Sequence, residues 1–298
     1  MKFGGAALED AASIKKISSI IYWSSQKNDL IIVVSAIKHV TDKLHRVLEI
    51  IKRADIQSAL KEIDCIYNDH VNLLREIDPS IQSLETEQKL KNLLDLLKLF
   101  VKKTSFDKLG DSQKDYIISF GERMSVHVIT HSLRFIKKVR SLALDTTSLL
   151  ATTKEFGRAK PLLDENLSSM KLILRKCLSE RVIPVITGYV GHAPDGCITT
   201  LGRGGSDLTA TLIASMISAD KVILWKDVVG LFDKDPKIDP DAKLFKVTDY
   251  NTAMDLSKHG AKILHPEAVE PVKTAKIPLQ IKSFLFPKGP GTLIADKV

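Results

Sequence analysis

The sequence predicts an α/β fold, a three-layer α/β/α sandwich around a mainly parallel sheet. Short apolar runs rich in β-branched residues alternate with stretches of helical apolar spacing, which is typical of parallel strands covered by helices on both faces. With 298 residues the chain can build a sizeable core, as one large domain or two smaller ones. The strand-like runs are residues 30–35, 139–144, 182–187, 221–225 and 278–282.

The segment between these first two strands is almost wholly helical in its pattern. From residue 42 to residue 133, apolar residues recur three and four positions apart. Such a stripe is typical of helices that pack one face against a core. We therefore interpret the most regular of these residues as packing groups, namely Leu90, Leu93, Leu94, Leu97 and Phe100.

After the third strand, residues 188–200 contain His-Ala-Pro-Asp-Gly and predict a hairpin. The hairpin leads into residues 199–211, TTLGRGGSDLTAT, a glycine-rich loop placed directly before an apolar helix. Amides at a helix start, together with the helix dipole, favour a bound anion. The loop matches neither the P-loop nor the dinucleotide fingerprint, so taken alone it is better interpreted as a helix cap by Ser206 or Asp207.

Two further segments place polar groups near strand ends. Lys2 is followed by Phe3 and the pair Gly4-Gly5, and a lysine beside two glycines can bring a cation to a phosphate. The run 30–35 ends in Ser35, and Thr41 follows shortly after. Ligands of open α/β sheets bind at the carboxyl ends of the strands, which is where these hydroxyls are expected.

Composition limits the class of protein without identifying it. The formal net charge is +8, but the lysines are spread along the chain rather than gathered with aromatic residues, so we expect no nucleic-acid partner. The three cysteines have no paired spacing, which predicts neither a disulfide framework nor a zinc site. No apolar run reaches the roughly 18 residues of a membrane span, and no targeting pattern is present. We expect a cytoplasmic protein without a membrane partner.

With residues 119–125, SFGERMS, these segments resemble the aspartokinases, which are members of the amino acid kinase family. The similar segments follow the family's order over nearly the whole chain, and SFGER together with GRGGSD is far more specific than a lone glycine motif. They are KFGG from Lys2, VVSA from Val33, SFGERMS from Ser119, TGYVG from Thr187, TTLGRGGSDLTAT from Thr199, WKDVVGLFDKDP from Trp225 and HGAKILHP from His259.

This resemblance implies ATP-dependent phosphorylation of the side-chain carboxylate of L-aspartate, the first step of lysine, threonine and methionine biosynthesis. Lys2 would stabilise charge on the transferred phosphoryl group, and Asp207 would organise the transfer centre. Arg203 would hold a carboxylate of aspartate, and Glu122 would pair with its ammonium group. The amino acid pocket would be completed by Ser35, Thr41 and Ser206.

For ATP, the resemblance implies that Lys226 and Asp227 approach adenine or ribose and that Phe232 packs on the nucleoside. The phosphates would meet Gly4, Gly5, Gly204, Gly205, Lys237 and Lys262. Asp233 and Asp235 do not complete a calcium-loop spacing, so no protein metal site is expected, and Mg²⁺ would arrive with ATP, held mainly by phosphate oxygens. We interpret His265 as a structural residue satisfied by nearby backbone, with Pro266 at a helix start.

We therefore expect one amino acid kinase domain over residues 1–298 that forms a homo-oligomer and has no regulatory ACT domain. Its helical, substrate-side segment would span about residues 42–133, and its nucleotide-side part about residues 200–298. Two alternatives remain. A kinase of the same fold acting on a different carboxylate or on carbamate is disfavoured by SFGER plus GRGGSD. The other alternative is a truncated, weakly active or inactive subunit that acts as a binding module.

Overall fold

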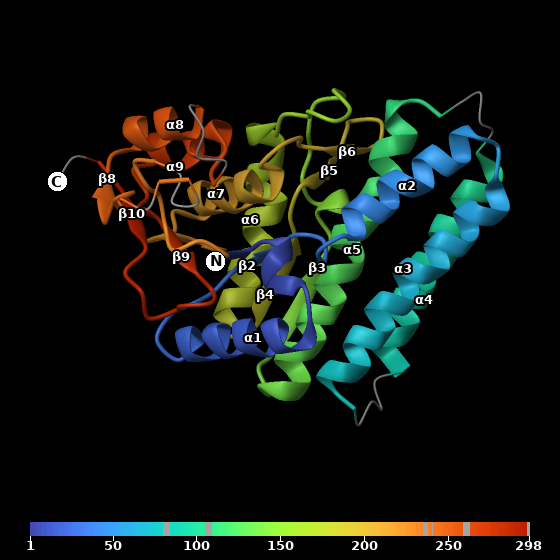
Figure 1. Ribbon diagram of the computed structural model, residues 1–298, viewed down its shortest axis with the longest axis horizontal. Coiled ribbons are helices and arrows are strands. Elements are labelled where there is room, and N and C mark those ends of the chain that lie inside the picture. The colour runs from blue at the N-terminus through green and yellow to red at the C-terminus, as the bar shows by residue number, and fades with distance from the viewer. Residues whose placement is uncertain (80–83, 105–108, 235–237, 240, 259–262, 297–298) are drawn as a thin grey trace.

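The computed structural model describes residues 1–79, 84–104, 109–234, 238–239, 241–258 and 263–296 (Figure 1). An eight-stranded sheet forms the middle layer, in the order β3-β4-β2-β1-β7-β9-β10-β8. Every pair of neighbours is parallel except β9 and β10. The strands are β1 (Lys2–Phe3), β2 (Ile32–Val34), β3 (Ser141–Leu144), β4 (Ile183–Thr187), β7 (Val222–Lys226), β8 (Val247–Thr248), β9 (Leu279–Ser283) and β10 (Thr292–Ile294).

The five strand-like runs of the sequence all form strands of this sheet, so the prediction is confirmed. The predicted hairpin is confirmed as well, because β5 (Val190–His192) pairs antiparallel with β6 (Ile198–Thr200) as a separate two-stranded sheet. Three strands were missed, and each has only two or three residues. A run of that length is recognised from the sequence only where it lies in a longer apolar segment, as the three-residue β2 does within residues 30–35, or beside a turn signal, as β5 and β6 do.

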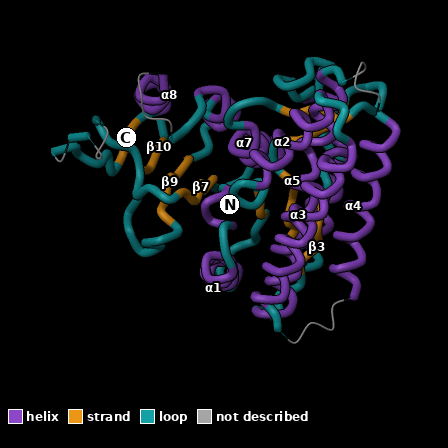
Figure 2. Tube along the Cα trace, turned by 45° about the vertical axis from the view of Figure 1, so that its right-hand side comes forward, coloured by secondary structure: helices purple, strands orange, loops and turns teal. Residues whose placement is uncertain are grey.

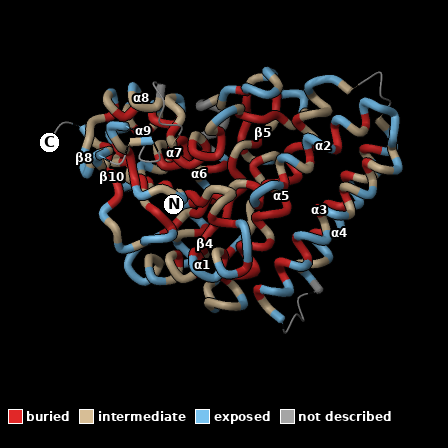
Figure 3. The backbone as a smooth tube through the Cα atoms, in the orientation of Figure 1, coloured by how far each residue is buried: buried red, intermediate tan, exposed pale blue. Residues whose placement is uncertain are grey.

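Helices cover both faces of the sheet, as predicted for a parallel sheet. Side chains of β2 alternate between the two cores: Ile32 and Val34 pack with α1 and α5 on one face, and Val33 packs with α6 and α7 on the other. Figure 3 shows the buried residues concentrated along the strands and the inward helix faces. These helices are α1 (Ala11–Ser25), α5 (Asp111–Ile136), α6 (Leu163–Ser179) and α7 (Gly205–Ile217), with α8 (Tyr250–Lys258) and α9 (Glu270–Thr274) farther along the chain.

The described part of residues 42–133 is helical apart from short connections between the helices, which confirms the predicted helical pattern. It comprises α2 (Val40–Lys52), α3 (Ile56–Ile77), α4 (Leu84–Lys103) and α5. The four leucines singled out in α4 are buried, and Phe100 packs partly buried against the same core. In Figure 1, α3 and α4 stand on the far side of α5 from the sheet, whereas β8, β10 and α8 lie at the opposite end of the molecule. Figure 2 likewise shows α4 at the end opposite to β10 and α8.

The sheet brings the carboxyl ends of its central strands together. Gly4 follows β1, Ser35 follows β2, Gly188 follows β4, and Lys226 is the last residue of β7. These strands are neighbours in the order β4-β2-β1-β7 and run in the same direction. Segments far apart in the sequence therefore meet at one edge of the sheet, which is where open α/β folds bind ligands.

Candidate active site

Two lysines and one aspartate form a charge cluster at this edge. Lys2 lies in β1 at the centre of the sheet, Lys226 ends the neighbouring β7, and Asp207 lies in the first turn of α7. Lys2 Nζ is 2.7 Å from Asp207 Oδ1, and Lys226 Nζ is 2.5 Å from Asp207 Oδ2. One carboxylate thus bridges two ammonium groups, and the cluster carries a net positive charge.

Burial decides how this cluster ionises. It lowers the pKa of Lys2, and the negative charge of Asp207 offsets part of that shift. For Asp207, burial alone would raise the pKa, but the two lysines outweigh it and hold the pKa below its ordinary value. Asp207 therefore stays a carboxylate at neutral pH and holds the ammonium groups of Lys2 and Lys226 at the cavity. A preorganised positive centre of this kind suits an anion of high charge, such as a phosphoryl group.

The glycine-rich loop positions Asp207 without a side-chain cap. The N-cap of α7 is Gly204, and the Asp207 carboxylate pairs with lysines, so the capping interpretation of Ser206 or Asp207 is wrong. Gly204 has a φ of 76°, and a Cβ atom there would lie 2.4 Å from the Cβ of His265. Position 204 therefore requires glycine because of its backbone conformation and its packing against His265. The first-turn residues Gly205, Ser206 and Asp207 of α7 line the same cavity as the lysines, at a helix end that favours anions.

Glu122 contributes a buried carboxylate from α5. Its Oε1 accepts a hydrogen bond of 3.1 Å from the amide of Ala36, while Oε2 is buried and has no hydrogen-bond partner among the described residues. Burial raises the pKa of Glu122 to about 7. The two nearby cations of α5 pair with other carboxylates: Arg123 pairs with Asp145, and Lys114 pairs with Asp111. A buried acceptor left open in this way fits a cationic or hydrogen-bond-donating ligand.

One cavity of about 1080 Å³ joins the lysine cluster to Glu122. Arg203 is exposed at its wall and makes no ion pair in the part of the chain that the structure describes. The cavity brings together most of the residues expected from the sequence: Lys2, Gly5, Ser35, Thr41, Glu122, Arg203, Gly204, Gly205, Ser206, Asp207 and Lys226.

The remaining expected residues lie elsewhere or cannot be placed. A Cβ at Gly4 would lie 3.5 Å from Lys2 Nζ, so Gly4 adjoins the cluster. Asp227 is exposed and Phe232 is half-buried, and neither lines this cavity. Lys237 and Lys262 fall outside the described residues.

Two cavity residues had no predicted ligand role. Tyr189 has a φ of 72°, a left-handed conformation that is costly for a bulky residue and that often marks functional sites. His265 precedes Pro266, which begins a 3-10 helix as expected. Its Nδ1 is buried with no hydrogen-bond partner among the described residues, so the described backbone does not satisfy this nitrogen as expected. The sequence signal for Tyr189 was its place in TGYVG, directly after a strand.

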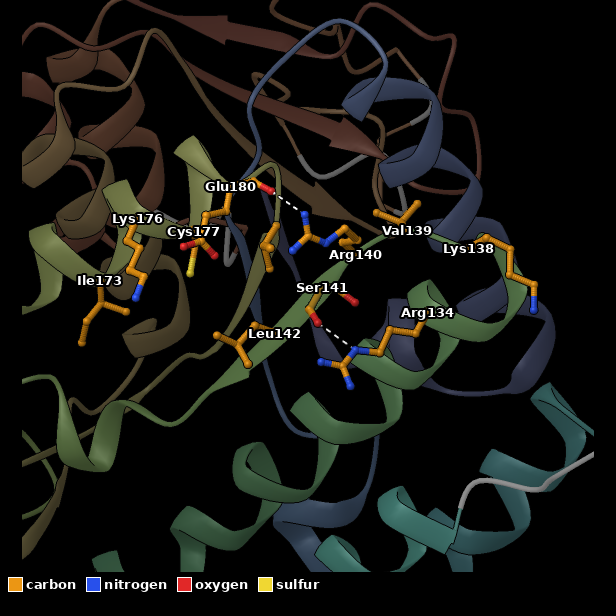
Figure 4. A pocket seen from close by; sticks show the side chains of 11 residues that line it. Arg134, Lys138, Val139, Arg140, Ser141, Leu142, Ile173, Lys176, Cys177 and Glu180 are labelled. Atoms are coloured by element: carbon orange, nitrogen blue, oxygen red, sulfur yellow. Dashed lines mark hydrogen bonds between the residues drawn. The ribbon is translucent and has the colours of Figure 1, made fainter.

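A second cavity, of about 790 Å³, lies at the other end of the sheet, where β3 and β4 begin. Figure 4 shows two of its arginines turned to the main chain. Arg134 Nε donates to the carbonyl of Ser141 at 2.8 Å, and Arg140 Nη1 donates to the carbonyl of Glu180 at 2.9 Å. These arginines are held by the backbone around β3 and the end of α6.

Within the described residues, no group of three or more histidine, cysteine or acidic side chains is arranged to hold a metal ion. The same residues include no helix both long enough and apolar enough to cross a membrane.

The fold and this site define a class. Residues 1–283 match the model of the amino acid kinase family, and the chain belongs to that family.

Within it, the chain is similar to aspartokinases over nearly all its length. It is 32% identical to aspartokinase 2, chloroplastic, of Arabidopsis thaliana, over 99% of this chain and 54% of that protein. It is 30% identical to lysine-sensitive aspartokinase 3 of Escherichia coli, over 99% of this chain and 64% of that protein. The crystal structure of E. coli aspartokinase III in complex with aspartate and ADP matches the whole chain and 64% of its own length, with a TM-score of 0.89 and 27% identity.

Proposed function

We propose that the chain phosphorylates the side-chain carboxylate of L-aspartate with ATP, giving 4-phospho-L-aspartate and ADP. The observation that carries the proposal is that one cavity holds both the lysine cluster and the pair Glu122 and Arg203. The first suits a phosphoryl group, and the second offers opposite charges to a zwitterionic amino acid. The aspartokinase relatives, one of them with aspartate and ADP bound, support this choice among kinases of the family.

The chemistry needs positioning and charge neutralisation rather than a base. A carboxylate oxygen of aspartate attacks the γ-phosphorus, the bond to the β-phosphate oxygen breaks, and ADP leaves with the electron pair. The nucleophile is already ionised at neutral pH, so no proton has to be removed. Lys2 and Lys226 lie where negative charge accumulates, and Asp207 keeps the two ammonium groups side by side. The role of Asp207 is thus electrostatic and geometric.

The amino acid is bound by residues from three elements. The open Oε2 of Glu122 would accept the substrate ammonium, and the guanidinium of Arg203 would hold the α-carboxylate. Hydroxyls that line the same cavity would complete the pocket: Ser35, Thr41 and Ser206.

ATP would lie across the strand ends with its phosphates at the glycine segments and the lysines. Gly5, Gly204 and Gly205 line the cavity there, and Gly4 is adjacent. Both oxygens of Asp207 are occupied by lysines, which supports a Mg²⁺ ion held mainly by the phosphates. Asp227 and Phe232 would serve the nucleoside, outside the cavity as described.

The proposal is tested by measuring ADP release with aspartate, with glutamate and with no acceptor. We expect release that depends on aspartate, together with an acyl phosphate that hydroxylamine traps as a hydroxamate. Release with glutamate instead would favour another carboxylate kinase. ADP release that no acceptor stimulates, with nucleotide still bound, would favour the alternative of a kinase-fold binding module.

Removing either charge of the amino acid site should weaken aspartate binding selectively. We expect Glu122→Ala and Arg203→Ala to raise the KM for aspartate roughly 10- to 100-fold, because each strands an opposite charge on the substrate. The KM for ATP should change much less. Lys114→Ala is the control, since Lys114 is on α5 but pairs with Asp111 at the surface. Equal increases in both KM values would contradict the assignment.

The pKa of Glu122 predicts a pH dependence. Because burial raises this pKa to about 7, Glu122 is protonated below that pH and loses the charge that attracts an ammonium group. We expect the KM for aspartate to rise about tenfold for each pH unit below 7, with a flatter KM for ATP. In Glu122→Gln this dependence should disappear. A variant that keeps the parent's pH profile would show that another group titrates.

A further inference from the structure

Asp115 is a buried carboxylate that no step above uses. It lies in α5, two turns before Glu122, and is 3% exposed. Its Oδ2 accepts hydrogen bonds of 2.8 Å from the amides of Gly157 and Thr200, and its Oδ1 accepts one of 2.9 Å from the hydroxyl of Thr200. Burying a carboxylate is costly unless it is hydrogen-bonded, and these three donors provide the compensation.

The donors belong to the two segments that support the Arg203 loop. Thr200 ends β6, three residues before Arg203, and its carbonyl accepts a hydrogen bond of 2.9 Å from Ala159. Gly157 packs closely against the loop that carries Arg203. Gly202 has a φ of 74°, and a Cβ there would lie 2.9 Å from the carbonyl oxygen of Gly157. One carboxylate therefore fixes both segments on which the loop rests.

The same helix carries the other half of the amino acid site. Asp115 and Glu122 are seven residues apart, which places them on one face of α5, about 10 Å apart along its axis. Gly157, Gly202 and Arg203 line the cavity, whereas Asp115 lies behind its wall. A chain of hydrogen bonds thus connects α5, through Asp115, with the segments next to the loop that carries Arg203.

We propose that Asp115 is a positioning residue that sets the spacing between Glu122 and Arg203 and so tunes the site to the length of its amino acid substrate. The inference rests on the proposed function for its substrate. Among the described residues, the hydrogen bonds that Asp115 accepts come from the backbone of Gly157 and from Thr200. A short zwitterion needs both of its charges met at once, and a small displacement of one binding group costs much of the affinity.

The decisive comparison is between Asp115→Ala and Asp115→Asn. Alanine leaves three donors behind the wall without an acceptor, so we expect the KM for aspartate to rise roughly 10- to 100-fold with little change in the KM for ATP. Asparagine has the same shape, and its amide oxygen can accept both backbone N–H groups while its NH₂ donates to the Thr200 hydroxyl. We expect Asp115→Asn to restore the KM for aspartate to within a few fold of the parent.

Asp111→Asn is the matched control. It removes the same charge one turn earlier on α5, where the side chain is exposed and pairs with Lys114. We expect it to leave both KM values unchanged. If Asp115→Ala does not fold, Thr200→Val replaces it, because valine removes only the hydroxyl, and a smaller rise in the KM for aspartate is then expected. Equal rises in both KM values, or no rescue by asparagine, would overturn the proposal.

A readout without substrate separates this inference from the proposed function. The amides of Gly157 and Thr200 are bonded to Asp115, so we expect faster hydrogen exchange at residues 155–159 and 198–207 in Asp115→Ala, with α1 unchanged as the internal reference. This holds even if the parent shows no turnover with aspartate, a result that would remove the proposed function alone. Exchange that matches the parent in both segments would show that Asp115 does not hold the loop.

Discussion

Replacing Lys2 by methionine should lower kcat roughly 10²- to 10³-fold and leave both KM values within a few fold of the parent. Methionine retains most of the buried stem of Lys2 in the central strand and removes only the ammonium group, which is 2.7 Å from Asp207. The transferring phosphoryl group would then lose one of its two preorganised cations. Steady-state kinetics with ATP and aspartate measure the effect, and circular dichroism checks that the fold is retained.

Lys38→Met is the matched control for this experiment. Lys38 is also at the cavity, but its ammonium group pairs with Glu9 and its side chain is 38% exposed. We expect kcat to remain close to that of the parent. A near-parental kcat in Lys2→Met would show that Lys2 is a structural cation, and a loss as large in Lys38→Met would show that the effect is one of overall charge.

The sequence predicted those parts of the fold whose signals are local. Strands such as β2 and β4 are recognisable because they lie in β-branched apolar runs that are bounded by polar residues. β1 has only two residues, and its strand character comes from pairing with β2 and β7 on either side. The place of Lys2 at the centre of the sheet is therefore a result of topology, which no window of sequence contains.

The site shows the same division between local and non-local information. Glu122, Arg203 and Asp207 stand in recognisable motifs, and the structure gathers them around one cavity. From its motif, Lys226 was expected near the nucleoside, whereas its ammonium group pairs with Asp207 in the structure because β7 is the neighbour of β1. The contact of Lys226 with ATP stays a prediction.

Asp115 was not singled out, and the surroundings of His265 were not foreseen, because both residues contact distant segments. Asp115 is bonded to residues 42 and 85 positions away, and His265 packs against Gly204. For Asp115 a weak local signal existed, since an acidic residue seven positions before Glu122 lies on the same buried face of α5. An unpaired carboxylate on such a face predicts a buried partner, although it does not say which one.

Replacing Asp207 by asparagine should be the most damaging single change to the fold. It removes the only charge that neutralises Lys2 and Lys226 in the described cluster, and Lys2 is nearly fully buried. Removing one partner of a buried ion pair typically costs about 3 to 5 kcal/mol of the free energy of unfolding. Urea denaturation at pH 7 measures this loss, and kcat should fall roughly 10²- to 10³-fold as well.

The cause of that instability can be identified from its pH dependence. Burial already lowers the pKa of Lys2, and replacing Asp207 removes the main interaction that offsets this shift. The folded variant therefore binds fewer protons than the unfolded chain between this lowered pKa and the ordinary 10.5. Stability of the variant should therefore rise with pH in that window, and its deficit against the parent should narrow. Adding Lys226→Met to Asp207→Asn removes one of the two repelling cations and should recover part of the lost free energy without recovering kcat. A deficit that is independent of pH, and that the second substitution does not reduce, would mean that Asp207 stabilises the fold by packing and not by holding two lysines together.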